Sequence, residues 1–224
     1  MDKFPNKIPL KGRAKYCLLF TKQLNLQKKV VVDIGSSFGW VEKGLLDSGA
    51  KLIGIEPNPE AVQFAKKNVT GDIKFLVGSV LLLPLSDKHS DVVLFYDVIE
   101  HVPKGQELMA LNEINRVLKK GGILLLSTPN NHLVNNLLDP AWYFGHRHYS
   151  LKKLEVFLKK SGFKVQYSGK RGGLLSLLYM IWFYILTSIF KISQPRNNLF
   201  ENLYDFSYRS DSGFVTHYIK AQKL

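Results

Sequence analysis

Short, continuous apolar runs alternate along this chain with segments of helical periodicity, and this alternation limits the folds open to it. We expect buried strands at residues 30–34, 51–55, 73–77, 91–95, 123–127 and 163–167. We expect helices at residues 40–48, 59–68, 106–119 and 151–161, and a terminal strand within 213–224. Such an order predicts an α/β fold, in which a mostly parallel sheet is covered by helices on both faces.

The composition is that of an ordered chain with little cysteine chemistry. Its 224 residues suffice for one sizeable α/β domain with an insertion, and 46% of them are hydrophobic. The single cysteine, Cys17, excludes an intramolecular disulfide and a zinc cluster built from cysteines. The first 16 residues contain no apolar run, so we expect no secretory signal and a reducing, cytoplasmic location.

The net charge of +13 is concentrated at the two ends of the chain. Residues 1–29 carry a net charge of +7 and residues 151–224 carry +8, whereas residues 30–150 carry −2. Basic flanks suit an anionic partner such as nucleic acid or a lipid headgroup layer. Solvated charge on exposed helices is the alternative interpretation, and the sequence leaves both open.

The stretch "VVDIGSSFGW", residues 31–40, leads a buried strand into a glycine loop. In an open parallel sheet, ligands bind at the carboxyl ends of the strands, where this loop falls. The dinucleotide pattern G-x-G-x-x-G fails, because Ser37 and Trp40 occupy its later glycine positions. The phosphate-binding pattern ending in Gly-Lys-Ser/Thr is absent too. Glu56 ends the next strand, 21 residues after Gly35, where a carboxylate can accept both hydroxyl protons of a ribose.

The loop Asp33-x-Gly35-x-Ser37-x-Gly39 resembles the Asp-x-Gly-x-Gly-x-Gly loop of class I S-adenosylmethionine-dependent methyltransferases. Four later stretches resemble the same family in the same order: "FLVGSVLLLPLSDKHSDVV", "FYDVIEHVP", "INRVLKKGGILLLSTPN" and "HRHYSLKKLEVFLKKSGFKV". The last is similar to the small-molecule branch that includes ubiquinone-biosynthesis O-methyltransferases. The resemblance implies the Rossmann-like fold of class I methyltransferases, with a seven-stranded sheet.

S-adenosylmethionine is the cofactor that this resemblance implies. Glu56 then binds the ribose, Asp33 and Asp97 contact the methionine part, and the stretch that begins at Phe75 surrounds the adenine. The implied cofactor-binding residues are Asp33, Gly35, Ser36, Ser37, Gly39, Glu56, Pro57, Ser79, Val80 and Asp97.

Two positions depart from the family pattern. Ser37 replaces the middle glycine, so we expect its backbone to avoid the positive φ angles that glycine adopts at little cost. Ser79 stands where the family has an acidic residue against the adenine amine, and a hydroxyl offers a hydrogen bond without charge assistance. We therefore expect weakened cofactor binding, and a S-adenosylmethionine-binding scaffold without turnover remains an alternative.

The acceptor side of the site is predicted from two stretches. His101, in "DVIEHVP", is a candidate base for a proton from an attacking hydroxyl, and a purely structural histidine is the alternative. The aromatic stretch 139–150 is expected to line the acceptor pocket through Trp142, Tyr143, His146, His148 and Tyr149. We expect no metal, because the spacing of His132, His146 and His148 matches no helical pair of ligands.

An uncharged apolar run of 17 residues, 174–190, separates the last two predicted strands. It is short for a membrane span, and the polar segment behind it cannot form a second one. Three interpretations remain: an interfacial helix in the plane of a membrane, a lid over the site, or a dimer surface. With Trp182, the tyrosines and the basic flanks, we expect a membrane-proximal lid.

These features divide the chain into a basic helical segment (1–29), a S-adenosylmethionine-binding core (30–169), an apolar helical insertion (170–212) and a terminal strand (213–224). We expect methyl transfer to a small molecule, at a hydroxyl oxygen and on an apolar or lipid-linked acceptor. An anionic membrane surface and a second copy of the chain are the candidate partners. RNA methylation is an alternative, but the core is not basic and no RNA-binding module is visible.

Overall fold

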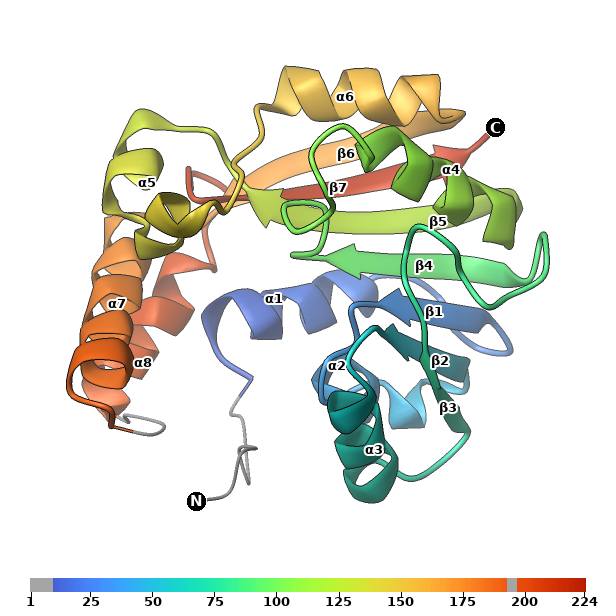
Figure 1. Ribbon diagram of the computed structural model, residues 1–224, viewed down its shortest axis with the longest axis horizontal. Helices are drawn as coiled ribbons and strands as arrows, with labels where there is room; N and C mark the ends of the chain where they lie inside the picture. The colour runs from blue at the N-terminus through green and yellow to red at the C-terminus, as the bar shows by residue number, and fades with distance from the viewer. Residues whose placement is uncertain (1–9, 193–196) are drawn as a thin grey trace.

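The computed structural model describes residues 10–192 and 197–224. Seven strands form one sheet in the order β3-β2-β1-β4-β5-β7-β6, and β7 runs antiparallel to both of its neighbours while the others are parallel (Figure 1). The strands are β1 (Val30–Ile34), β2 (Lys51–Glu56), β3 (Ile73–Val77), β4 (Ser90–Tyr96), β5 (Leu118–Pro129), β6 (Phe163–Arg171) and β7 (Thr216–Lys223). The predicted fold class is confirmed.

Helices connect these strands, and those at residues 59–68, 107–117 and 151–160 have bounds close to the predicted ones, whereas the helix at residues 133–138 was not predicted. They are α1 (Gly12–Thr21), α2 (Trp40–Lys43), α3 (Pro59–Asn68), α4 (Glu107–Val117), α5 (Leu133–Leu138), α6 (Leu151–Lys160), α7 (Leu174–Tyr184) and α8 (Asn198–Ser207). Short turns η1 (Leu46–Ser48), η2 (Pro140–Phe144) and η3 (Ile185–Ile189) complete the set. The start of α3 shows how local residues determine where a helix begins. The Asn58 side chain accepts the backbone N–H of Glu60 at 2.9 Å, and Pro59 occupies the first helical position.

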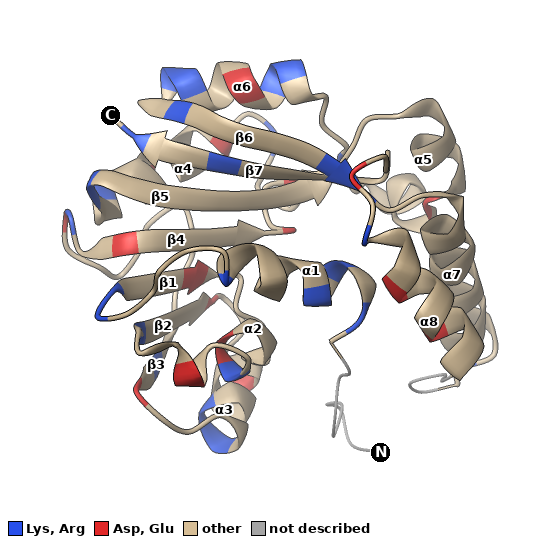
Figure 2. Cartoon of the chain, turned by 180° about the vertical axis from the view of Figure 1, so that it is seen from behind, with Lys and Arg blue, Asp and Glu red and all other residues tan. Residues whose placement is uncertain are grey.

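The core lies on both faces of the sheet. On one face, α4 and α6 bury apolar side chains such as Leu111, Ile114 and Leu158 against the strands. On the other, α1 buries Cys17 and Phe20. Figure 2, turned from the view of Figure 1, shows α1 lying across this second face. Both faces of the central strands are therefore covered, which explains why those strands read as continuous apolar runs.

The helix predicted over residues 40–48 is shorter in the structure. The α-helix ends at Lys43, Gly44 caps it, and η1 follows. A Cβ at Gly44 would lie 2.6 Å from Leu18 Cδ2, so a larger residue there would require the Leu18 side chain to move. Gly49 then turns the chain toward β2 with a left-handed φ of +72°. The apolar periodicity therefore predicts a longer helix than the chain forms.

The insertion between β6 and β7 forms a helical hairpin of α7, η3 and α8. The hairpin stands beyond the end of the sheet at which β4 and β5 finish (Figure 1). Tyr179 of α7 stacks on Tyr204 of α8 with ring centroids 4.4 Å apart. Asp205 of α8 accepts the backbone N–H of Gly12 at 2.8 Å and pairs with Lys15 at 2.6 Å, which joins the hairpin to α1. No helix among the described residues is long and apolar enough to cross a membrane.

A guanidinium group joins the two segments that follow β4 and β5. Arg147 donates hydrogen bonds to the carbonyl oxygens of Ile99, Glu100 and Val102. It also pairs with Glu107 at the start of α4, with 2.6 Å between Nη1 and Oε1. Burial opposes ionisation of Glu107, but hydrogen bonds from backbone N–H groups and from Tyr149, together with the charge of Arg147, lower its pKa below 4.5.

We predict that Glu107→Gln lowers the free energy of unfolding by about 1–3 kcal/mol near neutral pH, because it leaves the partly buried guanidinium of Arg147 without its counter-charge. A carboxylate whose pKa is lower in the folded state stabilises the fold above its unfolded pKa, and loses this effect as the pH falls through the folded pKa. Urea unfolding of wild type and variant should therefore converge in acid. Glu155→Gln, at an exposed carboxylate of α6, is the control, and an equal loss there would contradict the argument.

Candidate cofactor and acceptor site

The glycine loop leaves β1 at the carboxyl edge of the sheet and turns into α2. The backbone N–H groups of Gly35 and Ser36 donate to the Ile55 carbonyl of β2 at 2.8 and 3.2 Å. Gly35 has a φ of +81°, and a Cβ there would collide with the side chain of Val98. Gly39 has a φ of +79°. Both glycines are thus required by backbone angle as well as by space.

Ser37 adopts a left-handed backbone with a φ of +48°, so the expectation that it avoids positive φ is wrong. Its N–H donates to Glu56 Oε2 at 3.1 Å, and the hydrogen bonds of the loop to β2 leave the chain no other path. A left-handed conformation costs a non-glycine residue about 1–2 kcal/mol. The loop geometry therefore prevails over the local preference of serine.

Glu56 lies at the end of β2, beside the glycine loop. Its two carboxylate oxygens accept the N–H groups of Ser37 and Asn58, each at 3.1 Å. Each oxygen keeps a further lone pair, so the carboxylate can still accept two hydroxyl protons. The side chain is only half-buried. This position at the strand end, beside the glycine loop, is compatible with the predicted ribose contact.

A pocket with a volume of about 150 Å³ opens next to this loop. Four residues predicted to bind the cofactor line it: Gly35, Pro57, Ser79 and Val80. His101, the candidate base, lines the same pocket. The remaining walls are mostly apolar and come from β1, β2 and the segments after β3 and β4. The structure thus brings residues from four separated stretches of sequence to one cavity.

Asp33 lies beneath the loop rather than in the open pocket. It is 5% exposed, and Glu42 of α2 is buried beside it. Burial raises the pKa of Asp33 to about 8, and burial together with the charge of Asp33 raises that of Glu42 well above its usual range. Burial and mutual repulsion therefore both disfavour the charged forms of this pair.

Asp97, predicted to contact the methionine part, ends β4 in a left-handed conformation with a φ of +54°. Its Oδ1 accepts the Ser127 hydroxyl at 3.0 Å. Its Oδ2 pairs with Arg13 Nε of α1 at 3.1 Å. Strained backbone of this kind persists where surrounding contacts hold it, and it is enriched at functional sites. Sequence patterns do not reveal the contact with Arg13, because 84 positions separate the two partners.

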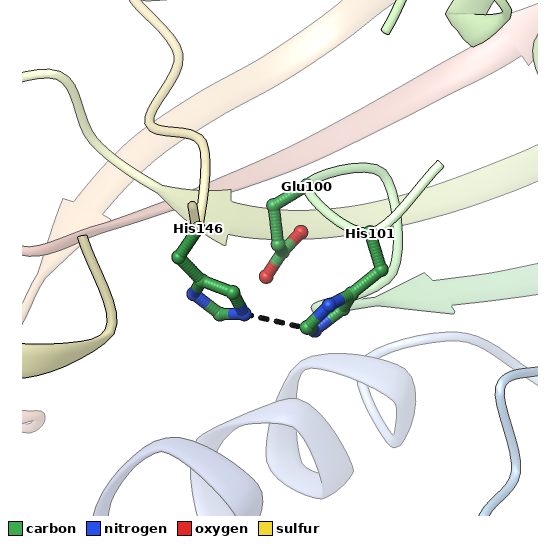
Figure 3. Close-up of side chains that lie close together, drawn as sticks. All are labelled: Glu100, His101 and His146. Atoms are coloured by element: carbon green, nitrogen blue, oxygen red, sulfur yellow. Dashed lines mark hydrogen bonds between the residues drawn. The ribbon is translucent and has the colours of Figure 1, made fainter. Parts of the chain in front are cut away.

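His101 and His146 face each other across the turn that follows β4. Their Nε2 atoms lie 3.0 Å apart and their rings meet edge to face (Figure 3). Partial desolvation lowers the pKa of both below 6.5, while the charge of Asp97 acts in the opposite direction on His101. Buried Glu100 completes the group. Burial and the charge of Asp97 raise its pKa to about 8.

The other residues predicted to line the acceptor pocket have different surroundings. Tyr149 is 1% exposed, belongs to the sheet core and donates its hydroxyl to Glu107 at 3.0 Å. His148 is buried between Asn136 and Asp139, at 2.7 and 3.0 Å. Trp142 packs over the His148 ring, and Tyr143 is largely exposed. Of the five, His146 is the residue whose ring contacts the predicted base.

Comparison with known proteins agrees with this arrangement. A family described as "Methyltransferase domain" matches residues 32–126. An uncharacterised methyltransferase of Mycobacteroides abscessus is 34% identical over 106 residues, which cover 46% of this chain and 40% of that protein. The matches span 36% to 40% of the length of the mycobacterial relatives. An uncharacterised protein of Methanocaldococcus jannaschii is 30% identical over 202 residues, covering 87% of this chain and 79% of that protein.

Solved structures share the fold at low sequence identity. A SAM-dependent methyltransferase from Archaeoglobus fulgidus aligns with a TM-score of 0.67 at 17% identity, covering 93% of this chain and 92% of that chain. The chain solved with the Haloferax volcanii Trm112 methyltransferase activator aligns with a TM-score of 0.67 at 22% identity, covering 94% of this chain and 88% of that chain. The [4+2]-cyclase SpnF aligns with a TM-score of 0.69 at 16% identity, covering 93% of this chain and 80% of that chain. These likenesses establish the fold, and the reactions named differ.

Sheet order, glycine loop, strand-end carboxylate and sequence relatives all agree, and the chain belongs to the class I S-adenosylmethionine-dependent methyltransferases. The cofactor of this class is S-adenosylmethionine, and the residues present fit it. Gly35 leaves a cradle that a Cβ would fill. The Ser36 hydroxyl is buried and has no hydrogen-bond partner among the described residues, so it can serve a ligand.

We predict that Glu56→Ala weakens S-adenosylmethionine binding by about 2–4 kcal/mol, because it removes a charged acceptor of two hydroxyl protons. Titration calorimetry on the full chain measures the change. Asp72→Ala, at an exposed carboxylate that precedes β3, is the matched control and should leave the affinity unaltered. Unchanged affinity in a folded Glu56→Ala protein would contradict the predicted contact between Glu56 and the ribose.

We predict that Ser79→Asp tightens S-adenosylmethionine binding by about 1 kcal/mol, because a carboxylate adds charge to the contact with the adenine amine. The Ser79 hydroxyl accepts the N–H of Leu81 at 3.2 Å, and an aspartate can keep this bond. Ser79→Ala is the companion variant and should not tighten binding. A loss of affinity in Ser79→Asp with an intact fold would place the adenine elsewhere.

Proposed function

We propose that this protein transfers the methyl group of S-adenosylmethionine to a hydroxyl oxygen of a small apolar acceptor, which it receives at a membrane surface. The observation that carries the proposal is the shared pocket: residues predicted to bind the cofactor, Gly35 and Ser79 among them, line the same cavity as His101. The predicted cofactor-binding residues and the predicted base therefore line one cavity.

Bound S-adenosylmethionine supplies a methyl group on a sulfonium, which a lone pair of the acceptor attacks in line. The residues of this chain position the two reactants, and positioning supplies much of the acceleration of such a displacement. A hydroxyl acceptor must also lose its proton. An imidazole nitrogen of His101, at the pocket wall, can accept a hydrogen bond from that hydroxyl.

An apolar acceptor is supported by the surface around the carboxyl edge of the sheet. Apolar side chains of the hairpin are exposed there, including Leu178 at 51%, Ile189 at 64% and Phe190 at 64%. Phe144 of η2 is 74% exposed and its ring lies 5.9 Å from that of Tyr184. Several large apolar side chains exposed next to one another indicate an interaction site.

An anionic lipid surface is the occupant that we propose for this apolar face. Helices that lie in the membrane interface combine leucine and aromatic side chains with basic neighbours. Lys191 follows η3 within the hairpin, and Lys11 and Lys15 lie on or next to α1, which contacts α8. In Figure 2 the other lysines and arginines are spread over helices and strand ends, as expected for solvated charge rather than a nucleic-acid groove.

The direct test is transfer of labelled methyl from S-adenosylmethionine to apolar hydroxyl compounds, lipid extract and RNA in parallel. We predict transfer into the apolar hydroxyl fraction, and a loss of about 10²-fold in turnover for His101→Gln with cofactor affinity retained. His132→Gln, at an exposed histidine of the same end of the molecule, should retain activity. Transfer into RNA alone would support the alternative function, and binding of the cofactor without any transfer would indicate a scaffold.

Vesicle sedimentation tests the membrane contact separately. We predict that the protein pellets with anionic vesicles, with a contribution of about 1 kcal/mol from each basic residue near the surface. Replacing Leu178, Ile185 and Ile189 by serine should abolish pelleting while keeping S-adenosylmethionine affinity, because the hairpin lies outside the cofactor loop. The control replaces the equally exposed Leu19, Met109 and Val156 by serine. Wild-type protein that stays in the supernatant at low salt would exclude the membrane contact.

A further inference from the structure

We propose that Glu100, His101 and His146 bind a divalent metal ion on the acceptor side of the site. A carboxylate oxygen of Glu100 and one ring nitrogen from each histidine all lie within 4.8 Å of one another. Figure 3 shows the three side chains converging on one point, from the turn after β4 and from the segment before α6. The role that we give the ion in catalysis rests on the proposed function, whereas its binding does not.

Glu100 is the strongest argument for a cation. Its side chain is 2% exposed, and Oε2 accepts the Thr128 hydroxyl at 3.0 Å. Its Oε1 is buried and has no hydrogen-bond partner among the described residues. A buried acceptor without a partner is costly, and a carboxylate more so. The Glu100 carboxyl group lies next to the two imidazoles (Figure 3), and an ion held there would give it a further partner.

The two histidines already have close to the separation of metal ligands. With metal–nitrogen bonds of about 2.0–2.1 Å, two ligands of a tetrahedral or octahedral ion lie roughly 3–3.5 Å apart. The Nε2 atoms of His101 and His146 are 3.0 Å apart. A small rotation of either ring therefore admits an ion between them, with Glu100 as the third ligand.

Hydrogen bonds hold these three ligands in place, and carboxylates balance the positive charge of the arginines nearby. Arg147 donates to the carbonyl oxygens of Ile99, Glu100 and Val102, so the turn that carries two ligands is joined to the segment that carries the third. Positive charge near a cation is unfavourable, and two arginines lie near His101. Each has a carboxylate partner: Glu107 pairs with Arg147, and Asp97 pairs with Arg13.

Two imidazoles and one carboxylate form a set that suits Zn²⁺ and other first-row divalent ions, and leaves coordination positions open. In the proposed reaction, an open position takes the oxygen of the acceptor hydroxyl, and the ion lowers the pKa of that hydroxyl so that its proton passes to water. The oxygen lone pair then forms the bond to the methyl carbon while the carbon–sulfur bond breaks and its electron pair stays on sulfur. His101 acts here as a ligand instead of receiving the proton.

Chain spacing alone does not reveal this set. The expectation of no metal rested on His132, His146 and His148, which match no helical ligand pair. The structure uses His148 differently, between Asn136 and Asp139. It joins His146 instead to a Glu-His pair that begins 46 positions earlier in the chain.

Titration calorimetry of Zn²⁺ and of Mn²⁺ into the chelator-treated full chain, without S-adenosylmethionine, tests the site. We expect one ion per chain, and a loss of at least about 10-fold in affinity for Glu100→Gln and for His146→Ala. His132→Ala is the matched control and should bind as wild type. Since Glu100→Gln affects a buried position, unfolding temperature is measured with and without the ion: it should rise for wild type and His132→Ala, and not for His146→Ala.

Absence of binding to folded wild-type protein, or binding that survives His146→Ala and Glu100→Gln, would overturn the metal site. Methyl-transfer assays with and without chelator separate this outcome from failure of the proposed function. Transfer to apolar hydroxyl compounds that is unaffected by metal removal would retain the function and reject the metal. An ion that binds at these residues in a protein without transfer to any hydroxyl acceptor would retain the site and reject the function.

Discussion

The guanidinium of Arg147 is the interaction on which the acceptor half of the molecule depends. Parallel strands β4 and β5 end at the same edge of the sheet, and the chain leaves the sheet there in two separate segments. Arg147 donates to three carbonyl oxygens of the first segment from within the second. Glu107 and Tyr149 extend this network into the core. These hydrogen bonds satisfy carbonyl groups of the first segment and join it to the second.

The cofactor half follows a different principle, in which backbone strain is maintained by neighbouring strands. Ser37 and Asp97 both adopt left-handed conformations, one in the loop after β1 and one at the end of β4. Each is held by backbone hydrogen bonds to an adjacent strand or by a carboxylate at its end. The neighbouring strands thus hold Ser37 and Asp97 at φ angles that these residues disfavour, and the stability of the sheet offsets the conformational free energy of this strain.

Sequence reasoning recovered the parts of the protein that local patterns encode. Continuous apolar strands and helices at a 3.6-residue period identified the sheet and many element bounds, and the glycine loop with Glu56 predicted a cofactor side whose loop and strand-end carboxylate lie together in the structure. Local patterns failed where contacts between distant segments decide the conformation. The α2 helix is shorter than its periodicity predicts, and Ser37 adopts a positive φ that serine disfavours. Arg13, Glu100 and Arg147 gained their roles only through contacts between elements far apart in the chain.

The register of the last two strands has a consequence for how such a protein diversifies. Arg171 at the end of β6 is paired directly with Thr216 at the start of β7. The helical hairpin therefore leaves and rejoins the sheet at neighbouring points, and its length does not alter the strand pairing. A segment attached in this way can be exchanged for another without refolding the catalytic body. The hairpin can thus differ in length and sequence while the pairing of β6 with β7 and the cofactor loop stay the same.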